Sequence, residues 1–249
     1  AYSSRAAEIC EYYGLPFINL KFPIDERPSL EQIEQILKEN QDIALVYITH
    51  NETGTGILNP IREIGALAHA YGAIFVVDTT STYAMRPINI KNDNIDFCMA
   101  SAQKGLMAMT GISFVVGKRT IIEQSKTYPK RSYYCNLYMQ YHYFEAHGEM
   151  HFTPPVQTVY AMRQAIKEYF AEGEQKKWER HTRVFEALHK GIERLGFQNI
   201  IKRDWQAGLV VTVKYPDDPN WSFSAIHDYC YKRGFTIYPG KINNTETFR

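Results

Sequence analysis

Short apolar runs that alternate with helix-like segments over the first 120 residues constrain the fold of this chain most strongly. The run from Ile43 to Ile48 is continuously apolar, which is typical of a strand buried on both faces of a sheet. Three further strands are predicted at residues 73–77, 95–99 and 112–116. Strands that alternate with helices predict a mostly parallel sheet with helices on both faces. The predicted fold class is therefore α/β.

Helical spacing and capping residues predict three helices in the same region. The first covers Ala6 to Tyr13 and is closed by Gly14. The second follows Ser29, which has the spacing of a capping box, and the third has Pro60 at its first position. A short strand is also predicted at Phe17 to Leu20.

The pattern changes after about residue 118. Tyr128 to Tyr143 is rich in tyrosine, and we interpret it as an irregular aromatic surface. Helices are predicted at Pro155 to Ala171 and at Glu174 to Leu195. The second of these helices has an apolar stripe made of Phe185, Leu188, Ile192 and Leu195.

The last segments predict a smaller α+β domain. Strands at Leu209 to Val213 and Phe235 to Tyr238 surround a helix at Phe223 to Lys232. We place a large α/β domain at residues 1–154, and a small domain that includes the connecting helix at residues 155–249. Because the chain begins without methionine and its last residues have the pattern of a strand entry, we expect both domains to be truncated.

Composition excludes several classes of function. The formal net charge is +1, from 28 basic and 27 acidic residues, so nucleic acid as a partner has no electrostatic support. The sequence has no long uncharged apolar stretch and no signal-peptide pattern, so no membrane span is predicted. The scattered cysteines form neither a zinc motif nor a disulfide framework. These features predict a cytoplasmic enzyme without a metal site.

Three loops that follow predicted strands contain the candidate chemistry: residues 50–56, 78–81 and 101–105. In open α/β sheets, ligands bind outside the carboxyl ends of the strands. Asp78 ends one strand, and Lys104 follows 26 positions later (104 − 78 = 26) in a turn of small residues. A lysine can bind the aldehyde of pyridoxal phosphate, and a carboxylate can keep the pyridine nitrogen protonated. The sequence therefore predicts a site for this cofactor.

At these motifs the chain resembles the class V aminotransferases of pyridoxal-phosphate fold type I. Within them it is most similar to the 2-aminoethylphosphonate–pyruvate transaminases. The resemblance runs over essentially the whole chain, and its matching segments are Ala1-Tyr2-Ser3-Ser4-Arg5, His50-Asn51-Glu52-Thr53-Gly54-Thr55-Gly56 with Asn59-Pro60, Val77-Asp78, Ser101-Ala102-Gln103-Lys104, Phe152-Thr153-Pro154-Pro155 and Gly240-Lys241 with Phe248-Arg249.

The resemblance implies transfer of an amino group from 2-aminoethylphosphonate to pyruvate, which gives phosphonoacetaldehyde and alanine. It also implies a homodimer with shared active sites. The implied roles are Schiff-base lysine for Lys104, partner of the pyridinium nitrogen for Asp78, phosphate contact for Gln103, contact to the ring oxygen for Thr53, stacking on the ring for Tyr2, phosphate contact across the dimer interface for Thr153, and binding of the substrate's acidic group for Arg249.

The sequence departs from the family pattern at four places. Thr79-Thr80-Ser81 stands where the transaminases usually have smaller or apolar residues before a serine, and a further strand is expected after Arg249. Gly54 replaces a hydroxyl residue that is common in this loop. The glycine-rich turn that would hold the cofactor phosphate should lie before Ala1. A catalytically incomplete or merely dimerising fragment therefore stays open beside an active enzyme.

Two related activities also stay open. They are those of an alanine– or serine–glyoxylate aminotransferase and, with less support, of a cysteine desulfurase. Each candidate site residue, taken by itself, also has a purely structural interpretation. Asp78, Thr53 and Gln103 can belong to a turn or a helix cap, Thr153 can start a helix, and Arg249 can be a surface charge.

Overall fold

The computed structural model describes residues 2–240 and 246–249. Ala1 and Lys241, which belong to the matching segments above, lie outside the described residues. The central sheet has the strand order β1-β4-β5-β6. Its first three strands are parallel, and the fourth is antiparallel to its neighbour. The strands are β1 (Leu45–Thr49), β4 (Ile74–Asp78), β5 (Phe97–Ser101) and β6 (Ser113–Gly117). The predicted mostly parallel α/β architecture is confirmed.

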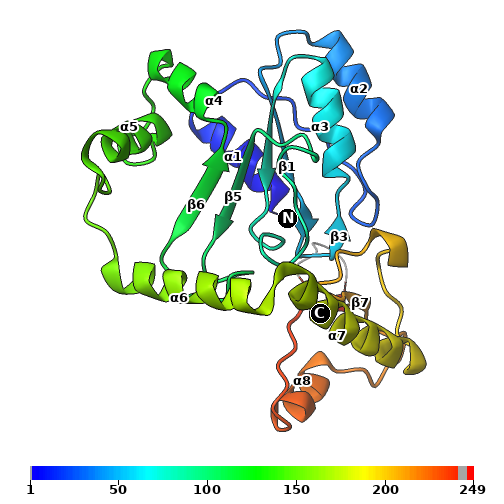
Figure 1. The fold of residues 1–249 in the computed structure, drawn as a ribbon. Helices are drawn as coiled ribbons and strands as arrows, with labels where there is room; N and C mark the ends of the chain where they lie inside the picture. Colours follow the sequence, from blue (N-terminus) through cyan, green and yellow to red (C-terminus); the bar gives the residue numbers. More distant parts are fainter. Residues whose placement is uncertain (1, 241–245) are drawn as a thin grey trace.

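Three helices cover this sheet (Figure 1), namely α1 (Ser3–Tyr12), α2 (Leu30–Glu39) and α3 (Ile61–Ala70). Helix α3 packs on β1 and β4, α2 packs on α3, and α1 lies against β1. The main core forms between the sheet and these helices, and Phe75, Val77, Ile64 and Ala68 are completely or almost completely buried there. Burial of each large apolar side chain contributes about 1.5–3 kcal/mol relative to exposure.

The predicted helix starts follow from local capping. The Ser29 side chain accepts a hydrogen bond from the Gln32 backbone N–H at 3.2 Å, which satisfies one free donor at the start of α2. Pro60 occupies the N-cap of α3 rather than its first helical position. Both helices therefore begin within one residue of the predicted place.

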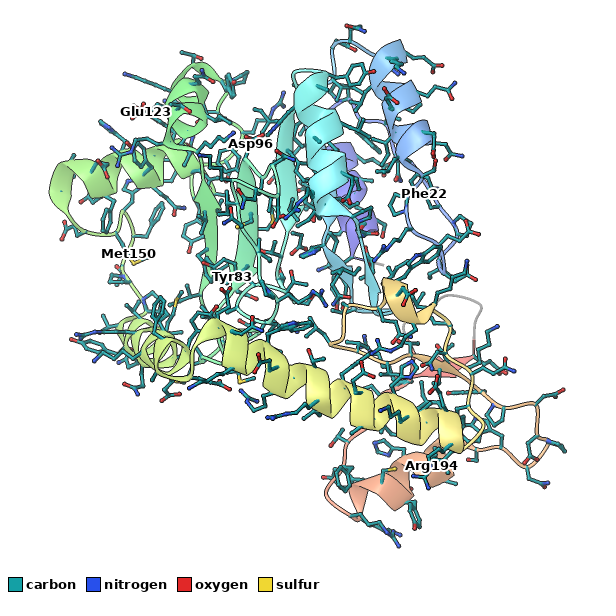
Figure 2. The ribbon with its side chains drawn as sticks, turned by 45° about the vertical axis from the view of Figure 1, so that its right-hand side comes forward. Phe22, Tyr83, Asp96, Glu123, Met150 and Arg194 are labelled. Carbon is teal, nitrogen blue, oxygen red and sulfur yellow. The ribbon has the colours of Figure 1, made fainter. Side chains whose placement is uncertain are left out.

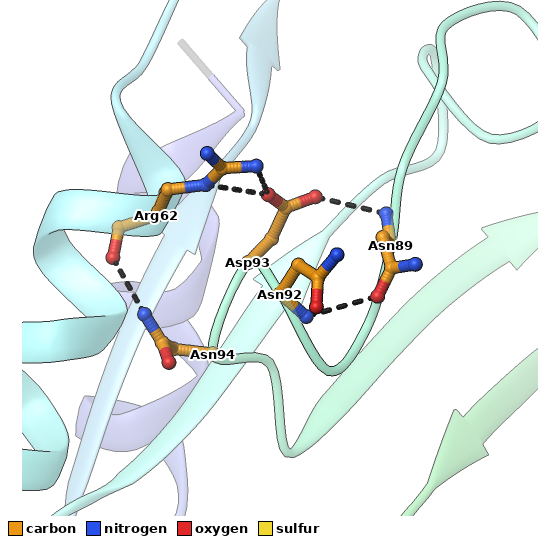
Figure 3. A network of polar contacts seen from close by, with 5 residues as sticks. All are labelled: Arg62, Asn89, Asn92, Asp93 and Asn94. Carbon is orange, nitrogen blue, oxygen red and sulfur yellow. Dashed lines mark hydrogen bonds and ion pairs between the residues drawn. The ribbon is translucent and has the colours of Figure 1, made fainter.

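A polar network fixes the loop that leads into β5 (Figure 3). The Arg62 guanidinium of α3 donates from Nε and Nη2 to Asp93 Oδ1 at 3.1 and 3.0 Å. Asp93 Oδ2 accepts from the Asn89 backbone N–H at 2.9 Å, and Asn94 Nδ2 donates to the Arg62 carbonyl at 3.1 Å. The loop is thus tied to α3 just before β5 begins.

Three predictions for this region are wrong in part. Phe17 to Leu20 forms no strand, because this exposed stretch pairs with no other strand in the described chain. Strand β1 is only half-buried, since it lies at one edge of the four-stranded sheet. The tyrosine-rich stretch is not irregular throughout, because it contains most of helix α5 (Leu137–His147). Helix α4 (Arg119–Gln124) and the 3₁₀ turn η1 (Ser125–Thr127) precede it.

Two long helices run along the lower end of the sheet in Figure 1, α6 (Val156–Glu172) and α7 (Glu174–Arg194). Both were predicted within one residue. The predicted stripe on α7 is only partly buried: Phe185 is in the core, whereas Leu195 is 75% exposed and Leu188 is also exposed. Lys177 and His189 are buried instead. Helical spacing alone did not distinguish these faces.

A second core cluster contains Phe185, Val211, Val213 and Phe248. The elements around it are η2 (Arg203–Trp205), β7 (Val213–Lys214), α8 (Phe223–Tyr231) and β8 (Thr247–Phe248), and β7 pairs antiparallel with β8. Only the last residue of the strand predicted at Leu209 to Val213 is in β7, and the stretch Phe235 to Tyr238 is not a regular strand. Instead, Tyr238 exchanges both backbone hydrogen bonds with Arg249, at 2.9 and 2.8 Å. The domain boundary after residue 154 stays a prediction.

Among the described residues, no helix is sufficiently long and apolar to cross a bilayer.

Candidate active site

Three predicted loops meet at the carboxyl edge of the parallel strands. Strands β1, β4 and β5 end at Thr49, Asp78 and Ser101. Backbone hydrogen bonds join their ends: His50 N–H donates to the Asp78 carbonyl at 2.9 Å, and Thr79 N–H donates to the Met99 carbonyl at 3.0 Å. This edge faces α6 and α7 (Figure 1). The structure therefore brings Asp78 and the Lys104 turn to neighbouring strand ends.

The two carboxylate oxygens of Asp78 have different partners. Oδ1 accepts the Thr80 backbone N–H at 2.8 Å, which forms a turn after β4. Oδ2 has a long contact of 3.5 Å with the Tyr47 hydroxyl. Burial, together with the charge of Asp78, raises the pKa of Tyr47 to about 12, so the phenol stays a neutral donor. The turn therefore uses one oxygen, and the other can accept a further hydrogen bond.

Lys104 lies exposed on the turn after β5. Its amine makes no hydrogen bond or ion pair with any residue that the structure describes. The turn itself is ordered, since Lys104 N–H donates to the Ser101 carbonyl at 3.3 Å and Met107 N–H donates to the Lys104 carbonyl at 2.9 Å. The Lys104 amine has no protein partner in the described part of the chain and its backbone is held in place, so the amine is available to bind a ligand.

Gly105 is buried directly beside this lysine. A Cβ at this position would overlap the Tyr83 carbonyl oxygen and lie 2.7 Å from Met85 Cγ. Figure 2 labels Tyr83 at the lower end of the sheet, next to α6 and α7. The close approach of these two backbone segments requires glycine.

Gln103 has a buried side-chain oxygen without a hydrogen-bond partner among the described residues. Asn51 Oδ1, in the neighbouring loop, has none either. Buried polar atoms are normally paired, and an unpaired one costs about 1–3 kcal/mol. A bound ligand or water would satisfy both atoms, so their presence at this edge fits a polar ligand.

The loop at residues 50–56 contains a short hairpin of β2 (Asn51–Glu52) and β3 (Ile57–Leu58). His50 Nδ1 lies 3.0 Å from Thr82 Oγ1, and Asn51 Nδ2 donates to Ser81 Oγ at 3.0 Å. Burial, with a smaller effect from Arg86, lowers the pKa of His50 to about 4, so this imidazole is neutral near pH 7. His50 thus acts as a hydrogen-bonding residue inside the loop.

Tyr2 and Arg249 are far apart in sequence, yet both contact this hairpin region. The Glu52 carboxylate accepts the backbone N–H groups of Tyr2 and Ser3 at 3.2 and 3.0 Å. Arg249 Nη1 donates to the Thr53 carbonyl at 2.5 Å. The structure therefore places Tyr2, Thr53 and Arg249 at one loop beside Asp78.

Thr153 lies outside the three loops, and within the described chain no hydrogen bond links it to this edge. It is exposed, between α5 and α6. Its contact with a partner subunit stays a prediction.

Two residues around this edge were missed by sequence reasoning. Tyr47 contributes its hydroxyl to Asp78, and a polar group inside the apolar run of β1 is the signal that could have found it. Lys177 donates from α7 to the Gly105 carbonyl at 2.5 Å. Lys177 follows Lys176 in a highly charged helix, so nothing in the sequence indicated its burial.

The opposite edge of the sheet has a cavity of about 260 Å³ lined by His69, Asp96 and Lys118, among others. Asp96 accepts the Phe75 N–H at 2.7 Å and pairs with His69 and Lys118 at 2.9 and 2.5 Å. Burial alone would raise the pKa of Asp96, but hydrogen bonds led by that from Lys118 outweigh it and lower the pKa. This mutually satisfied cluster joins strand ends and leaves the carboxyl edge as the better ligand site.

No group of three or more His, Cys, Asp or Glu side chains within residues 2–240 and 246–249 has the arrangement of a metal site.

Comparison with known proteins places this fold in a class. The solved structure of alanine–glyoxylate aminotransferase from Nostoc sp. has a TM-score of 0.87 and 23% identity, over 98% of this chain and 66% of that one. It shows that the fold is that of the aminotransferases. The family model described as aminotransferase class-V matches residues 2–235. The chain belongs to the class V aminotransferases.

Curated relatives match over the whole chain. A bifunctional phosphonoacetaldehyde hydrolase/aminoethylphosphonate transaminase of Clostridioides difficile (strain 630) is 33% identical over 251 residues, which are 100% of this chain and 39% of that protein. A 2-aminoethylphosphonate–pyruvate transaminase of Lysinibacillus sphaericus (strain C3-41) is 32% identical over 250 residues, 100% of this chain and 68% of that protein. The chain thus spans about two fifths of the first relative and about two thirds of the second.

Proposed function

We propose that this chain acts in a pyridoxal 5'-phosphate-dependent transaminase that transfers the amino group of 2-aminoethylphosphonate to pyruvate. The products are phosphonoacetaldehyde and alanine. The observation that carries the proposal is the meeting of Asp78 and the partner-free Lys104 at neighbouring strand ends. The names of the curated relatives support the choice of donor and acceptor.

The residues at this edge fit the cofactor. Asp78 Oδ2 can accept a hydrogen bond from the protonated pyridine nitrogen, while Oδ1 keeps the hydrogen bond that it accepts from the Thr80 backbone N–H. The unpaired Gln103 Oε1 can accept a hydrogen bond from water bound at the cofactor phosphate, and Lys104 provides the amine that attaches the cofactor. When bound, pyridoxal phosphate supplies an electron sink for the carbanion formed at the substrate carbon.

Lys104 has two tasks in this mechanism. Its amine would hold the cofactor, and when Nζ is free it would act as the general base that takes the proton from the substrate carbon. No described residue occupies the amine, so it is free to move between these tasks. Oδ2 of Asp78 would accept a hydrogen bond from the ring nitrogen of the bound cofactor.

Arg249 and Thr53 form the substrate side of the site. The Arg249 guanidinium uses Nη1 on the Thr53 carbonyl, and its remaining donors can bind a phosphonate or a carboxylate in a forked geometry. Tyr2, held by Glu52 at the same loop, is the candidate for stacking on the ring.

A homodimer completes the proposal. Thr153 is exposed on the segment between α5 and α6, where it can reach the cofactor phosphate of a partner subunit. We also propose that residues 1–154 form the cofactor-binding domain, that residues 155–249 form the smaller domain, and that the enzyme is cytoplasmic.

A donor and acceptor assay tests this function. Purified protein is given pyridoxal phosphate, then 2-aminoethylphosphonate with pyruvate or serine with glyoxylate, and product formation is compared. We expect the first pair to be used at least about tenfold better, a difference of about 1.4 kcal/mol in transition-state binding. Lys104→Ala should abolish the reaction, whereas Lys126→Ala, an exposed control in η1, should not.

Each competing function has its own result in this assay. A preference for serine and glyoxylate would assign the chain the activity of a serine–glyoxylate aminotransferase. Release of sulfide from cysteine would favour a cysteine desulfurase, although Cys230 lies within α8, away from a mobile loop. Failure to bind the cofactor would show that these residues do not assemble a site by themselves.

A further inference from the structure

The most unusual charged group outside the predicted site is Lys177 of α7. It is only 4% exposed and makes no ion pair with a carboxylate among the described residues. Removal of an amine from water is costly unless it is paired. Burial accordingly lowers the pKa of Lys177, an effect that Glu172 opposes and Arg180 reinforces. A buried cation without a carboxylate partner needs another compensating interaction.

The structure supplies that interaction at the Lys104 turn. Lys177 Nζ donates to the Gly105 carbonyl at 2.5 Å. It also lies 5.2 Å from the centre of the Tyr169 ring of α6, within the range of a cation–π contact. The amine therefore joins both long helices to the residue that directly follows Lys104.

The turn is held from two sides. On one side Gly105 packs against the Tyr83 carbonyl with no room for a Cβ. On the other side Lys177 binds the Gly105 carbonyl. The backbone inside the turn is closed by Met107 N–H on the Lys104 carbonyl at 2.9 Å and by Ala108 N–H on the Ala102 carbonyl at 3.0 Å. Without Lys177, the turn loses its hydrogen bond from α7.

We propose that Lys177 is a positioning residue, which fixes the Lys104 turn from the connecting helix and sets the place of the reacting amine. The inference rests on the proposed function, in which Lys104 is the reacting lysine. Lys177 itself does not touch the substrate. It acts through the Gly105 carbonyl, so its loss should move Lys104 and leave the substrate-binding Arg249 side unchanged.

Three variants test this inference. Lys177→Met keeps an unbranched side chain but removes the charge and the donors. Lys177→Gln keeps an N–H donor on a shorter, uncharged side chain, and is measured in case the methionine variant does not fold. Lys176→Met is the matched control, because Lys176 is the exposed neighbour on the same helix.

Two readouts are combined. Hydrogen–deuterium exchange without cofactor should rise in residues 101–108 of Lys177→Met, where the amides of Met107 and Ala108 are bonded within the turn. Steady-state kinetics should show kcat lower by about 10²-fold, the effect of a displacement of about 1 Å, with KM for the amino donor changed by less than about threefold. Lys177→Gln should show the same local rise in exchange with a smaller loss of kcat, and Lys176→Met should match the wild type.

The outcomes separate this inference from the proposed function. An inactive wild-type chain would refute the proposed function, and the inference with it. An active wild type whose Lys177 variants keep normal kcat and normal local exchange would overturn the inference alone. Faster exchange over the whole chain would also overturn it, because Lys177 would then be a residue of general stability.

Discussion

Gly105→Ala is the sharpest steric test of the site, because the structure fixes how far the turn must move. The added Cβ would overlap the Tyr83 carbonyl oxygen and lie 2.7 Å from Met85 Cγ. Carbon atoms pack at about 3.5–4.0 Å, so the methyl must recede from Met85 and further still from the oxygen. Tyr83 cannot simply yield, since its backbone N–H donates to the Thr79 carbonyl at 2.7 Å. The Lys104 turn therefore has to shift by about 1 Å.

A shift of that size has a calculable effect. Misplacement of a reacting group by about 1 Å costs about 10²-fold in rate, which corresponds to about 2.7 kcal/mol of transition-state stabilisation. We expect kcat to fall by this amount and cofactor absorbance at saturation to change. The measurements are steady-state kinetics at saturating cofactor and an absorbance titration with pyridoxal phosphate.

Gly191→Ala is the matched control for this experiment. Gly191 lies within α7, and a Cβ there would meet no atom within 4 Å. The substitution should leave kcat unchanged and stabilise the helix by about 0.4–1 kcal/mol. A folded Gly105→Ala protein that keeps a normal kcat would refute the steric reasoning.

Three further predictions concern acid stability, the ring partner and helix capping. The pKa of His50 is about 4 in the folded protein, against its ordinary value of 6.5 in an unfolded chain. The unfolded chain therefore binds the proton first as the pH falls. The free energy of unfolding should drop by about 2 kcal/mol from pH 7 to pH 5. His50→Asn should flatten that dependence in denaturant titrations, and an equally steep curve would contradict it. Asp78→Asn should lower kcat by about 10²-fold, in the range of lost electrostatic stabilisation, with little change in Tm, since its side-chain oxygen can still accept the Thr80 N–H; a normal kcat would exclude the ring-partner role. Ser29→Ala should cost about 1 kcal/mol of stability through loss of the α2 cap without altering cofactor binding, as measured by thermal unfolding.

The sequence predicted the elements whose signals are local. The cap at Ser29 and the apolar runs of β4 and β5 depend on neighbouring residues, and each was found within about two positions. The strand predicted at Phe17 to Leu20 was wrong, because a strand exists only when another strand pairs with it. The predicted burial of Leu195 was wrong because α7 ends at Arg194 and Leu195, its C-cap, is 75% exposed.

The part of the site that depends on strand topology could be predicted from the sequence. Asp78 and Lys104 both follow parallel strands, and the carboxyl ends of parallel strands share one edge. Contacts between distant segments were not predictable from spacing. Arg249 reaches Thr53 over 196 positions, and Lys177 reaches Gly105 over 72. Such contacts depend on how distant segments pack in the folded chain, and no local pattern encodes that packing.

The most direct test of the central claim is to identify the amine that binds the cofactor. The protein is incubated with pyridoxal phosphate, the covalent link is reduced with borohydride, and the modified residue is located by peptide mass spectrometry. We expect modification at Lys104 and its loss in Lys104→Ala. Modification at Lys177 or another lysine, or transamination by Lys104→Ala at the wild-type rate, would contradict the assignment of Lys104.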